Sequence, residues 1–498
     1  MMKTKEDIST QDIKRSLKAT SLFGGMEIFG IGISLIRTKI IALLIGPSGV
    51  GLIELFSSTI RLISSLTNFS LSTSAVRDIS VSYQGNDKER FIYLTSVFSK
   101  IVWFTGLLGA VICLIGAPLW SKFTFGNYSQ AISFVALSIV LLLNQLMTGN
   151  TVLLQGTGHF RYMAMSSVLG NLIGLFTTIP IYFYLRTRGI VLVLIIAAII
   201  SYVLSYVYKN KLKLNYIKLS LKATFKEGKA MLCQGFLLSL NFLYSTIIFY
   251  VLRIFITNNG GIEELGLYAA SFAIVNTYVG LVFQAMAKEY YPRLASVSSD
   301  DFKFNSAINS QIYMVLLILA PLISFFLLCS DYLLYILYSE KFSGANLLLS
   351  LSMLGVLFQA PSVCLGYAFL AKADNKAFLT YETIAKSIKL LTDILFYYFW
   401  GITGIGISFL IFYLYYTLQC VYICHRLYGF FMQYRIVLRL FVYVTVGGGL
   451  IFISTFLQKS YGMAVGSVIV FLICLDSYKQ LSKYIEIHTI MSKLFKKK

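Results

Sequence analysis

The sequence predicts an all-α, polytopic membrane protein with about fourteen transmembrane helices. Of its 498 residues, 57% are hydrophobic and only 13% are charged, and the mean hydropathy is +0.76. Soluble domains contain about 45–50% apolar and about 25% charged residues. Apolar runs of about 20 residues, the length that crosses a bilayer as a helix, also recur along the chain between short polar segments. This composition indicates that most of the chain lies within a lipid bilayer.

The predicted spans fall before and after a basic segment in the middle of the chain. The six before it are Ser21–Ile45, Val50–Ser72, Ile92–Leu119, Ala131–Leu154, Tyr162–Leu185 and Gly189–Tyr208. The eight after it are Ala230–Ile256, Leu265–Ala287, Ala307–Cys329, Asn346–Leu370, Ala377–Trp400, Ile402–Cys424, Ile436–Leu457 and Gly462–Leu475. No signal-peptide cleavage pattern precedes the first span, so we expect it to stay as an anchor.

The basic residues orient these spans. With the amino terminus in the cytoplasm, most of the 42 Lys and Arg side chains fall on the cytoplasmic side, as the positive-inside rule requires. The densest cluster follows the sixth span and contains Lys209, Lys211, Lys213, Lys218, Lys222, Lys226 and Lys229. This distribution explains the net charge of +21 without a nucleic-acid partner and suits anionic lipid headgroups. We therefore expect both termini on the cytoplasmic side of a bacterial inner membrane.

Motifs for cofactors and catalysis are missing from the sequence. The seven cysteines lie in or at the ends of apolar spans, where they behave as small hydrophobic residues. No spacing of Cys, His, Asp or Glu indicates a metal site, and no phosphate-binding loop or nucleophile with its base occurs. We expect a transporter, not an enzyme, without cofactors and driven by a proton or sodium gradient.

The chain also contains a faint internal repeat. GPSGVGL after the first span matches GGIEELGL after the seventh, with Gly51 and Gly266 at equivalent positions 215 residues apart. Gly189 and Gly404 are separated by the same offset. The repeat predicts two pseudo-symmetric six-helix lobes, residues 1–208 and 230–424, joined by a basic linker at 209–229. Residues 425–498 would add two helices and a basic tail.

Charged side chains inside the spans carry the functional information, because each costs about 2.5–3.5 kcal/mol at a helix centre. Glu54, Arg61 and Asn68 belong to a polar stripe about 80° wide on the second span. Within the first twelve spans there are seven bases, Arg37, Lys39, Arg61, Lys100, Arg253, Lys386 and Lys389, but only four acids, Glu27, Glu54, Glu382 and Asp393. Pairing alone leaves a surplus of positive charge, which predicts a water-filled basic chamber for an anionic, amphiphilic ligand.

The opening segment resembles a known family. GPSGVGL and the SAVRDIS end of the second span are similar to the Wzx-type O-antigen flippases, which belong to the multidrug/oligosaccharidyl-lipid/polysaccharide exporter superfamily. The resemblance implies a V-shaped bundle of two lobes, like that of the multidrug exporters, which carries an undecaprenyl-diphosphate-linked oligosaccharide through a cationic central cavity by alternating access. It implies that the diphosphate and acidic sugars are bound by Arg37, Arg61, Arg253, Lys386 and Lys389.

Other roles are assigned by side-chain type. The acids Glu27, Glu54 and Asp393 are candidate proton carriers. Glycan contacts are expected from amide side chains, and the candidates are Asn68, Asn144, Gln145 and Asn241. A polysaccharide polymerase and a chain-length regulator are the protein partners that this function would imply.

Three alternatives stay open from the sequence. Lipid II flippases of the same superfamily have fourteen helices, so the peptidoglycan precursor remains a candidate substrate. An ion-coupled multidrug antiporter would favour an acidic or neutral chamber, which the surplus of bases argues against. A membrane-embedded polymerase or ligase usually has a large outer loop with Arg and His, whereas the longest outer loop here, near residues 330–345, is short and contains no His.

Overall fold

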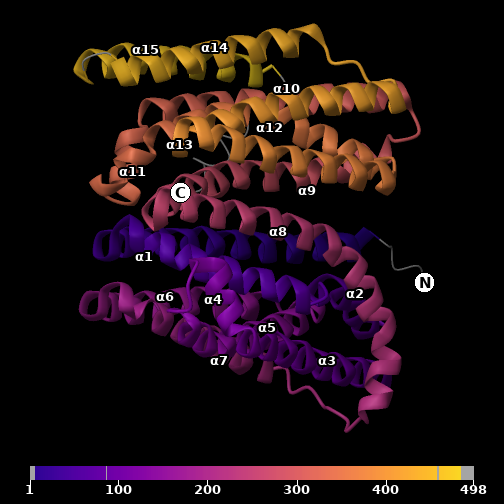
Figure 1. The fold of residues 1–498 in the computed structure, drawn as a ribbon. Helices are drawn as coiled ribbons and strands as arrows, with labels where there is room; N and C mark the ends of the chain where they lie inside the picture. The colour runs from indigo at the N-terminus through magenta and orange to yellow at the C-terminus, as the bar shows by residue number, and fades with distance from the viewer. Residues whose placement is uncertain (1–5, 86, 457–458, 484–498) are drawn as a thin grey trace, which may run out of the picture. The chain divides into compact units, whose positions relative to one another are not determined.

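The computed structural model describes residues 6–85, 87–456 and 459–483, and in these ranges it contains helices and no strands (Figure 1). The helices of the first half are α1 (Glu6–Thr67), α2 (Leu71–Gln84), α3 (Lys88–Ile115), α4 (Ala117–Phe125), α5 (Ala131–Gly156), α6 (Phe160–Leu185), α7 (Ile190–Asn210) and α8 (Leu221–Ile274). Those of the second half are α9 (Gly280–Ser296), α10 (Asp301–Leu328), α11 (Ser330–Leu337), α12 (Asn346–Ala371), α13 (Asn375–Tyr428), α14 (Tyr434–Phe456) and α15 (Lys459–Leu481).

The fourteen predicted spans map onto these helices, except that Leu457, the last residue of the thirteenth, lies outside the described residues. Among the described residues, ten stretches are long and apolar enough to cross a membrane. Four of them, residues 29–67, 160–210, 239–296 and 375–428, contain 39, 51, 58 and 54 residues and each holds two predicted spans. The chain breaks inside each at a non-helical residue or a short 3₁₀ or π segment. The all-α, multi-pass fold is thereby confirmed.

Two predicted spans end earlier than expected. The second was predicted to reach Ser72, but α1 stops at Thr67 because Phe69 and Ser70 adopt left-handed backbone angles (φ 48° and 45°) before α2 begins. The third was predicted to reach Leu119, but α3 stops at Ile115 and α4 restarts after Gly116, with a proline in its first turn. Proline fits the first turn of a helix, where its missing N–H has no partner to lose.

The internal repeat is visible in the backbone. Left-handed residues recur at the 215-residue offset in three pairs: Gly46 and Gly261, Gly158 and Ala373, and Arg186 and Gly401. The angles agree within the first pair (φ 65°, ψ −171° and φ 83°, ψ 175°) and within the last (φ 51°, ψ −134° and φ 56°, ψ −145°). Because such conformations are rare outside glycine, their recurrence at one offset supports the repeat found in the sequence.

The turns at Gly46 and Gly261 bring α1 and α8 into backbone contact. A Cβ on Gly51 would lie 2.0 Å from the carbonyl oxygen of Ile262, and one on Gly266 would lie 2.0 Å from that of Pro47. Each residue of one contact is 215 positions from its counterpart in the other. The contact is therefore reciprocal, and it admits only glycine at both positions.

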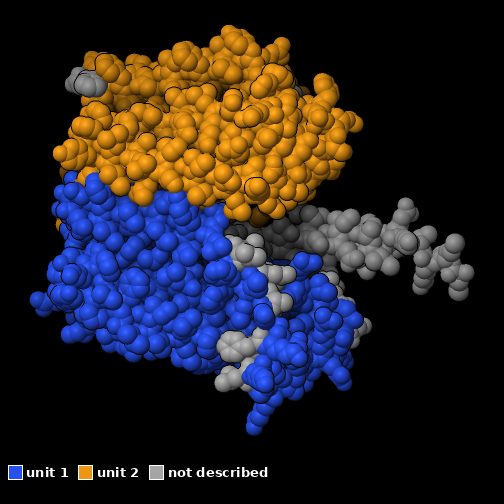
Figure 2. Space-filling model, turned by 45° about the vertical axis from the view of Figure 1, so that its right-hand side comes forward, with its two compact units in different colours: residues 1–266 blue, residues 267–498 orange. Residues whose placement is uncertain are grey.

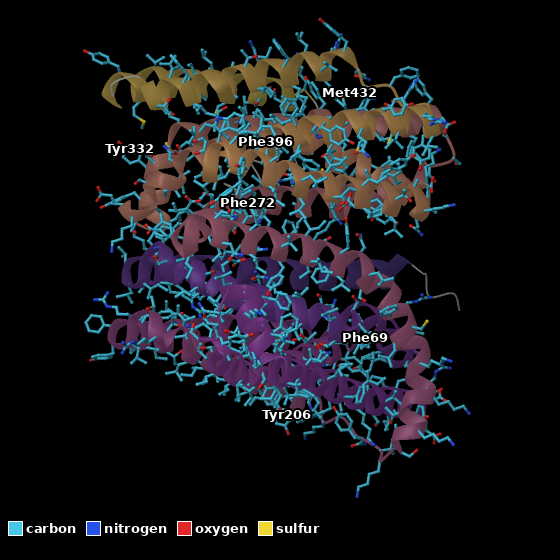
Figure 3. The ribbon with its side chains drawn as sticks, in the orientation of Figure 1. Phe69, Tyr206, Phe272, Tyr332, Phe396 and Met432 are labelled. Atoms are coloured by element: carbon cyan, nitrogen blue, oxygen red, sulfur yellow. The ribbon has the colours of Figure 1, made fainter. Side chains whose placement is uncertain are left out.

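The chain divides into two compact units, residues 1–266 and 267–498 (Figure 2). In unit 1, α5 packs against α3 and α7, and α6 packs against α1 and α7. In unit 2, α12 packs against α10 and α13, while α14 and α15 lie side by side and pack on α10 (Figure 1). Side chains occupy much of the space between the helices of each unit (Figure 3). The division into 1–208, 209–229, 230–424 and 425–498 stays a prediction.

Candidate functional site

In unit 1, one carboxylate holds two arginines. Oε1 of Glu54 accepts a hydrogen bond from Nη2 of Arg61 at 2.6 Å and another from Nε of Arg253 at 2.6 Å. Arg253 also donates through Nη1 to the carbonyl oxygen of Phe249 at 2.9 Å. The side chains of Arg253 and Glu54 are 16% and 20% exposed, whereas that of Arg61 is 50% exposed. This Glu54 cluster carries one net positive charge and presents unused guanidinium N–H groups on Arg61.

Arg37 lies apart from that cluster, on α1 against α6. Its guanidinium passes over Gly174, where an added Cβ would lie 3.6 Å from Nη1 of Arg37. The Tyr182 hydroxyl, on the same helix, is close enough to interact with it electrostatically. Among the residues that the structure describes, Arg37 forms no ion pair, and its buried Nε has no hydrogen-bond partner. No carboxylate of the described residues therefore balances its charge.

In unit 2, Lys389 and Asp393 form a closed ion pair on α13. Nζ of Lys389 donates to both oxygens of Asp393, at 2.5 and 2.6 Å, and the Asp393 side chain is only 3% exposed. Ser408 donates to the same carboxylate at 2.6 Å from the second half of α13. The rings of Phe409 and Phe412 lie 5.5 and 5.7 Å from the ammonium. A buried pair with these additional donors is satisfied internally.

A second pair lies nearer the start of α13. Nζ of Lys386 is 3.4 Å from Oε1 of Glu382, and the Tyr416 hydroxyl donates to Oε2 of Glu382 at 2.5 Å. Contacts from Glu382 to Tyr416 and from Asp393 to Ser408 show that the two halves of α13 run antiparallel about the turn at Trp400–Gly401. The four charges of these two pairs cancel.

The charge balance therefore differs between the units. The five predicted substrate-binding bases meet three acids, Glu54, Glu382 and Asp393. Both lysines of unit 2 have a carboxylate each, so the surplus of two positive charges falls on Arg37, Arg61 and Arg253 of unit 1. The structure brings Arg61 and Arg253 together but leaves Arg37 separate from them.

The predicted glycan contacts have different surroundings. Oδ1 of Asn68 accepts from the backbone N–H of Ser70 at 3.1 Å and stabilises the break between α1 and α2. Nε2 of Gln145 donates to Thr105 at 2.9 Å in a buried contact between α5 and α3. Asn144 and Asn241 are partly exposed on α5 and α8. The side chain of Glu27 lies outside those that the structure describes. Roles in substrate binding or coupling remain predictions for all of these residues.

Several polar side chains of the site were not predicted from the sequence. Ser408 and Tyr416 complete the two acid sites of α13, and Nε2 of Gln359 donates to Tyr413 at 3.0 Å beside them. The sequence contained only a weak signal for these contacts. Gln359 is a glutamine in the middle of an apolar helix, and Tyr413 and Tyr416 are three residues apart.

All seven cysteines are free thiols. No group of three His, Cys, Asp or Glu side chains in the described ranges is arranged to hold a metal ion.

Known proteins resemble this chain in sequence and in fold. A family model described as "Polysaccharide biosynthesis protein" matches residues 40–347. The chain is 21% identical to the lipid III flippases of Escherichia coli (strain K12) and of Shigella flexneri over 374 residues, which cover 73% of this chain and 87% of each relative. Among solved structures, the lipid II flippase MurJ in an inward closed conformation has a TM-score of 0.67 at 16% identity, covering 93% of this chain and 99% of MurJ. An inward-facing multidrug resistance MATE transporter has a TM-score of 0.63 at 14% identity, covering 82% of this chain and 94% of that protein.

Proposed function

This chain belongs to the polysaccharide biosynthesis protein family, and we propose that it is a flippase for a lipid-linked oligosaccharide. It is a membrane transporter with the fold of the multidrug/oligosaccharidyl-lipid/polysaccharide exporter superfamily, not an enzyme. The proposed substrate is an undecaprenyl-diphosphate-linked repeat unit of O-antigen or a similar surface polysaccharide. It would move from the cytoplasmic to the outer leaflet of the bacterial inner membrane.

The observation that carries this proposal is the unbalanced charge of unit 1. Arg61 and Arg253 share the single carboxylate of Glu54 at 2.6 Å each. Guanidinium groups match phosphate oxygens in shape and bind them through two parallel hydrogen bonds. A diphosphate brings more negative charge than one carboxylate, so it would balance both arginines. Lipid is the natural environment for the attached prenyl chain.

Glu54 gives the site a way to change state. A bound diphosphate would compete with its carboxylate for Arg61 and Arg253, so substrate entry and Glu54 release would be linked. A proton or a sodium ion could then neutralise the freed carboxylate, which is the coupling that an ion-driven flippase needs. Alternating access by such a cycle requires no nucleotide site.

Two alternatives make different predictions. A lipid II flippase would use the same diphosphate chemistry, and the fourteen spans predicted from the sequence fit it equally well. An ion-coupled antiporter for cationic drugs is disfavoured because the unbalanced charges at the candidate site are positive. Contact with a polysaccharide polymerase or a chain-length regulator would follow from O-antigen transport.

Complementation tests the proposal. A strain lacking its own O-antigen flippase is given the wild-type chain or Arg61→Ala, and surface glycan is read on a gel. Lys303→Ala is the matched control, since Lys303 pairs with Asp300 at an exposed helix start. Wild type and Lys303→Ala should restore the glycan, Arg61→Ala should not, and Arg61→Lys should restore part of it.

The result that contradicts the diphosphate assignment is full activity in Arg61→Ala. Failure of the wild type leads to the same test in a strain depleted of its lipid II flippase, where rescue supports the first alternative. If the wild-type chain restores function in neither strain, the antiporter becomes the favoured alternative.

A further inference from the structure

Unit 1 contains a cavity that the proposed diphosphate site does not use. It has a volume of about 520 Å³ and is bounded by α1, α5, α6 and α7. This volume lies within the range of about 300–1,000 Å³ that is typical of small-molecule sites. The apolar part of its wall includes Ile31, Met147, Met163 and Val168. The polar part consists of hydroxyl and amide side chains, which are Ser34, Thr151, Ser166, Ser167, Asn171 and Ser201.

Five of these six polar side chains differ from most hydroxyls of the unit; the exception is Thr151, which donates to the carbonyl oxygen of Met147 at 3.0 Å. Ser58, Ser65 and Thr67, like many others, donate to a carbonyl oxygen three or four residues earlier in their own helix. Within the described part of the chain, Ser34, Ser166, Ser167, Asn171 and Ser201 make no side-chain hydrogen bond. At membrane depth an unsatisfied polar group is costly. The cavity therefore offers a ring of unused donors and acceptors to water or to a polyhydroxylated ligand.

Arg37 is not part of the cavity wall, but it lies one helical turn beyond wall residues on both α1 and α6. Ser34 is one helical turn before Arg37 on α1, and Asn171 is one turn before Gly174 on α6. The guanidinium of Arg37 lies against Gly174. Helical side chains point back toward the amino terminus of their helix, so that of Arg37 is directed toward the level of Ser34. The same two helices thus place an unpaired cation beside the unused hydroxyls.

We propose that this cavity is a glycan subsite that binds one acidic sugar, with Arg37 on the sugar carboxylate and the hydroxyl and amide groups on the ring hydroxyls. The proposal rests on the proposed function, because it concerns the sugar portion of that substrate. The mixed wall suits a carbohydrate, whose ring has apolar faces and a polar edge. A lipid acyl chain would leave the five polar side chains unsatisfied, and an inorganic anion would fill only the end near Arg37.

A crossed binding experiment on the full-length protein in detergent tests this subsite. The probes are D-glucuronate, D-glucose, inorganic phosphate and undecaprenyl diphosphate without sugar, and the readout is the dissociation constant from ligand-dependent thermal stabilisation. Arg37→Gln removes the charge at similar size. Ser167→Phe fills the cavity from a partly open position on α6. Arg61→Gln is the matched control, because it removes a guanidinium from the other cluster.

We expect D-glucuronate to bind the wild type and Arg61→Gln, and to bind at least tenfold more weakly to Arg37→Gln and Ser167→Phe. D-Glucose should bind more weakly than glucuronate to the wild type, and Arg37→Gln should abolish that difference. Undecaprenyl diphosphate should show the opposite pattern, with weakened binding only in Arg61→Gln.

Several results would overturn the subsite. These are absence of glucuronate binding, equal binding of glucose and glucuronate, glucuronate binding that Ser167→Phe does not change, or inorganic phosphate binding as tightly as glucuronate. Failure of undecaprenyl diphosphate to bind the wild type would instead count against the proposed function. Because each ligand has its own sensitive variant, the two failures are distinguishable.

Discussion

Gly51→Ala tests the contact between α1 and α8 on which the architecture of unit 1 depends. The new Cβ would lie 2.0 Å from the carbonyl oxygen of Ile262, 3.0 Å from its Cγ2 and 3.1 Å from the backbone nitrogen of Gly266. Ordinary contact begins at 3.4 Å, so the two backbones must separate by about 1.4 Å. Overpacking of this kind costs about 1–3 kcal/mol or more. The better helix propensity of alanine returns at most about 1 kcal/mol.

Gly32→Ala is the matched control on the same helix. A Cβ at Gly32 meets no atom within 4 Å, so this variant receives the helix-propensity gain without the clash. Gly266→Ala should behave like Gly51→Ala, since its Cβ would lie 2.0 Å from the carbonyl oxygen of Pro47.

The assay is thermal unfolding of the purified protein in detergent, followed by tryptophan fluorescence. For a unit of this size, 1 kcal/mol corresponds to about 2–4 °C. Gly51→Ala and Gly266→Ala should lower the midpoint by roughly 2–10 °C, while Gly32→Ala leaves it unchanged or raises it slightly. Equal midpoints for Gly51→Ala and Gly32→Ala would refute the close contact.

Three further predictions concern the charged residues. Asp393→Asn leaves the Lys389 ammonium enclosed without its partner and should lower the free energy of unfolding by about 3–5 kcal/mol. The double variant with Lys389→Met should recover most of this loss. An unchanged thermal midpoint in Asp393→Asn would contradict the closed pair. Arg439→Met removes the 3.0 Å ion pair to Asp476 between α14 and α15. Because the Asp476 side chain is 45% exposed, the free energy of unfolding should fall by at most about 1 kcal/mol. A fall in the thermal midpoint that corresponds to a larger loss would contradict this account. Glu54→Gln should slow transport and flatten its dependence on pH, measured as initial rates in vesicles; an unchanged pH dependence removes Glu54 as a proton carrier.

The spans were predictable because lipid imposes a length and a composition on each helix. The breaks between helices inside these spans were harder to predict. Proline and glycine marked the turn at Gly46, but nothing in the sequence separated Asn68 from its helix. The π-helical segment Val275–Val279 also had no signal in the local sequence. Such local breaks depend on packing against other helices, which periodicity does not report.

The charged site was predictable in its composition but not in its pairing. Spacing on one helix placed Glu54 and Arg61 in the same polar stripe, where side chains on one helix face can meet. It could not show that Arg253, about 200 residues away, shares the carboxylate of Glu54. Nor could it show that Arg37 stands apart, since that depends on how α1 meets α6. The surplus of positive charge was correct in sign, and the structure locates it in unit 1.

The most direct test of the account is the translocation rate of a fluorescent undecaprenyl-diphosphate-linked oligosaccharide in reconstituted vesicles, compared between the wild type and Arg253→Gln. Lys303→Ala serves as the control, and the thermal midpoint of each variant is measured alongside. The account predicts that Arg253→Gln translocates at least tenfold more slowly than both others while remaining folded. Translocation at the wild-type rate by folded Arg253→Gln would contradict it.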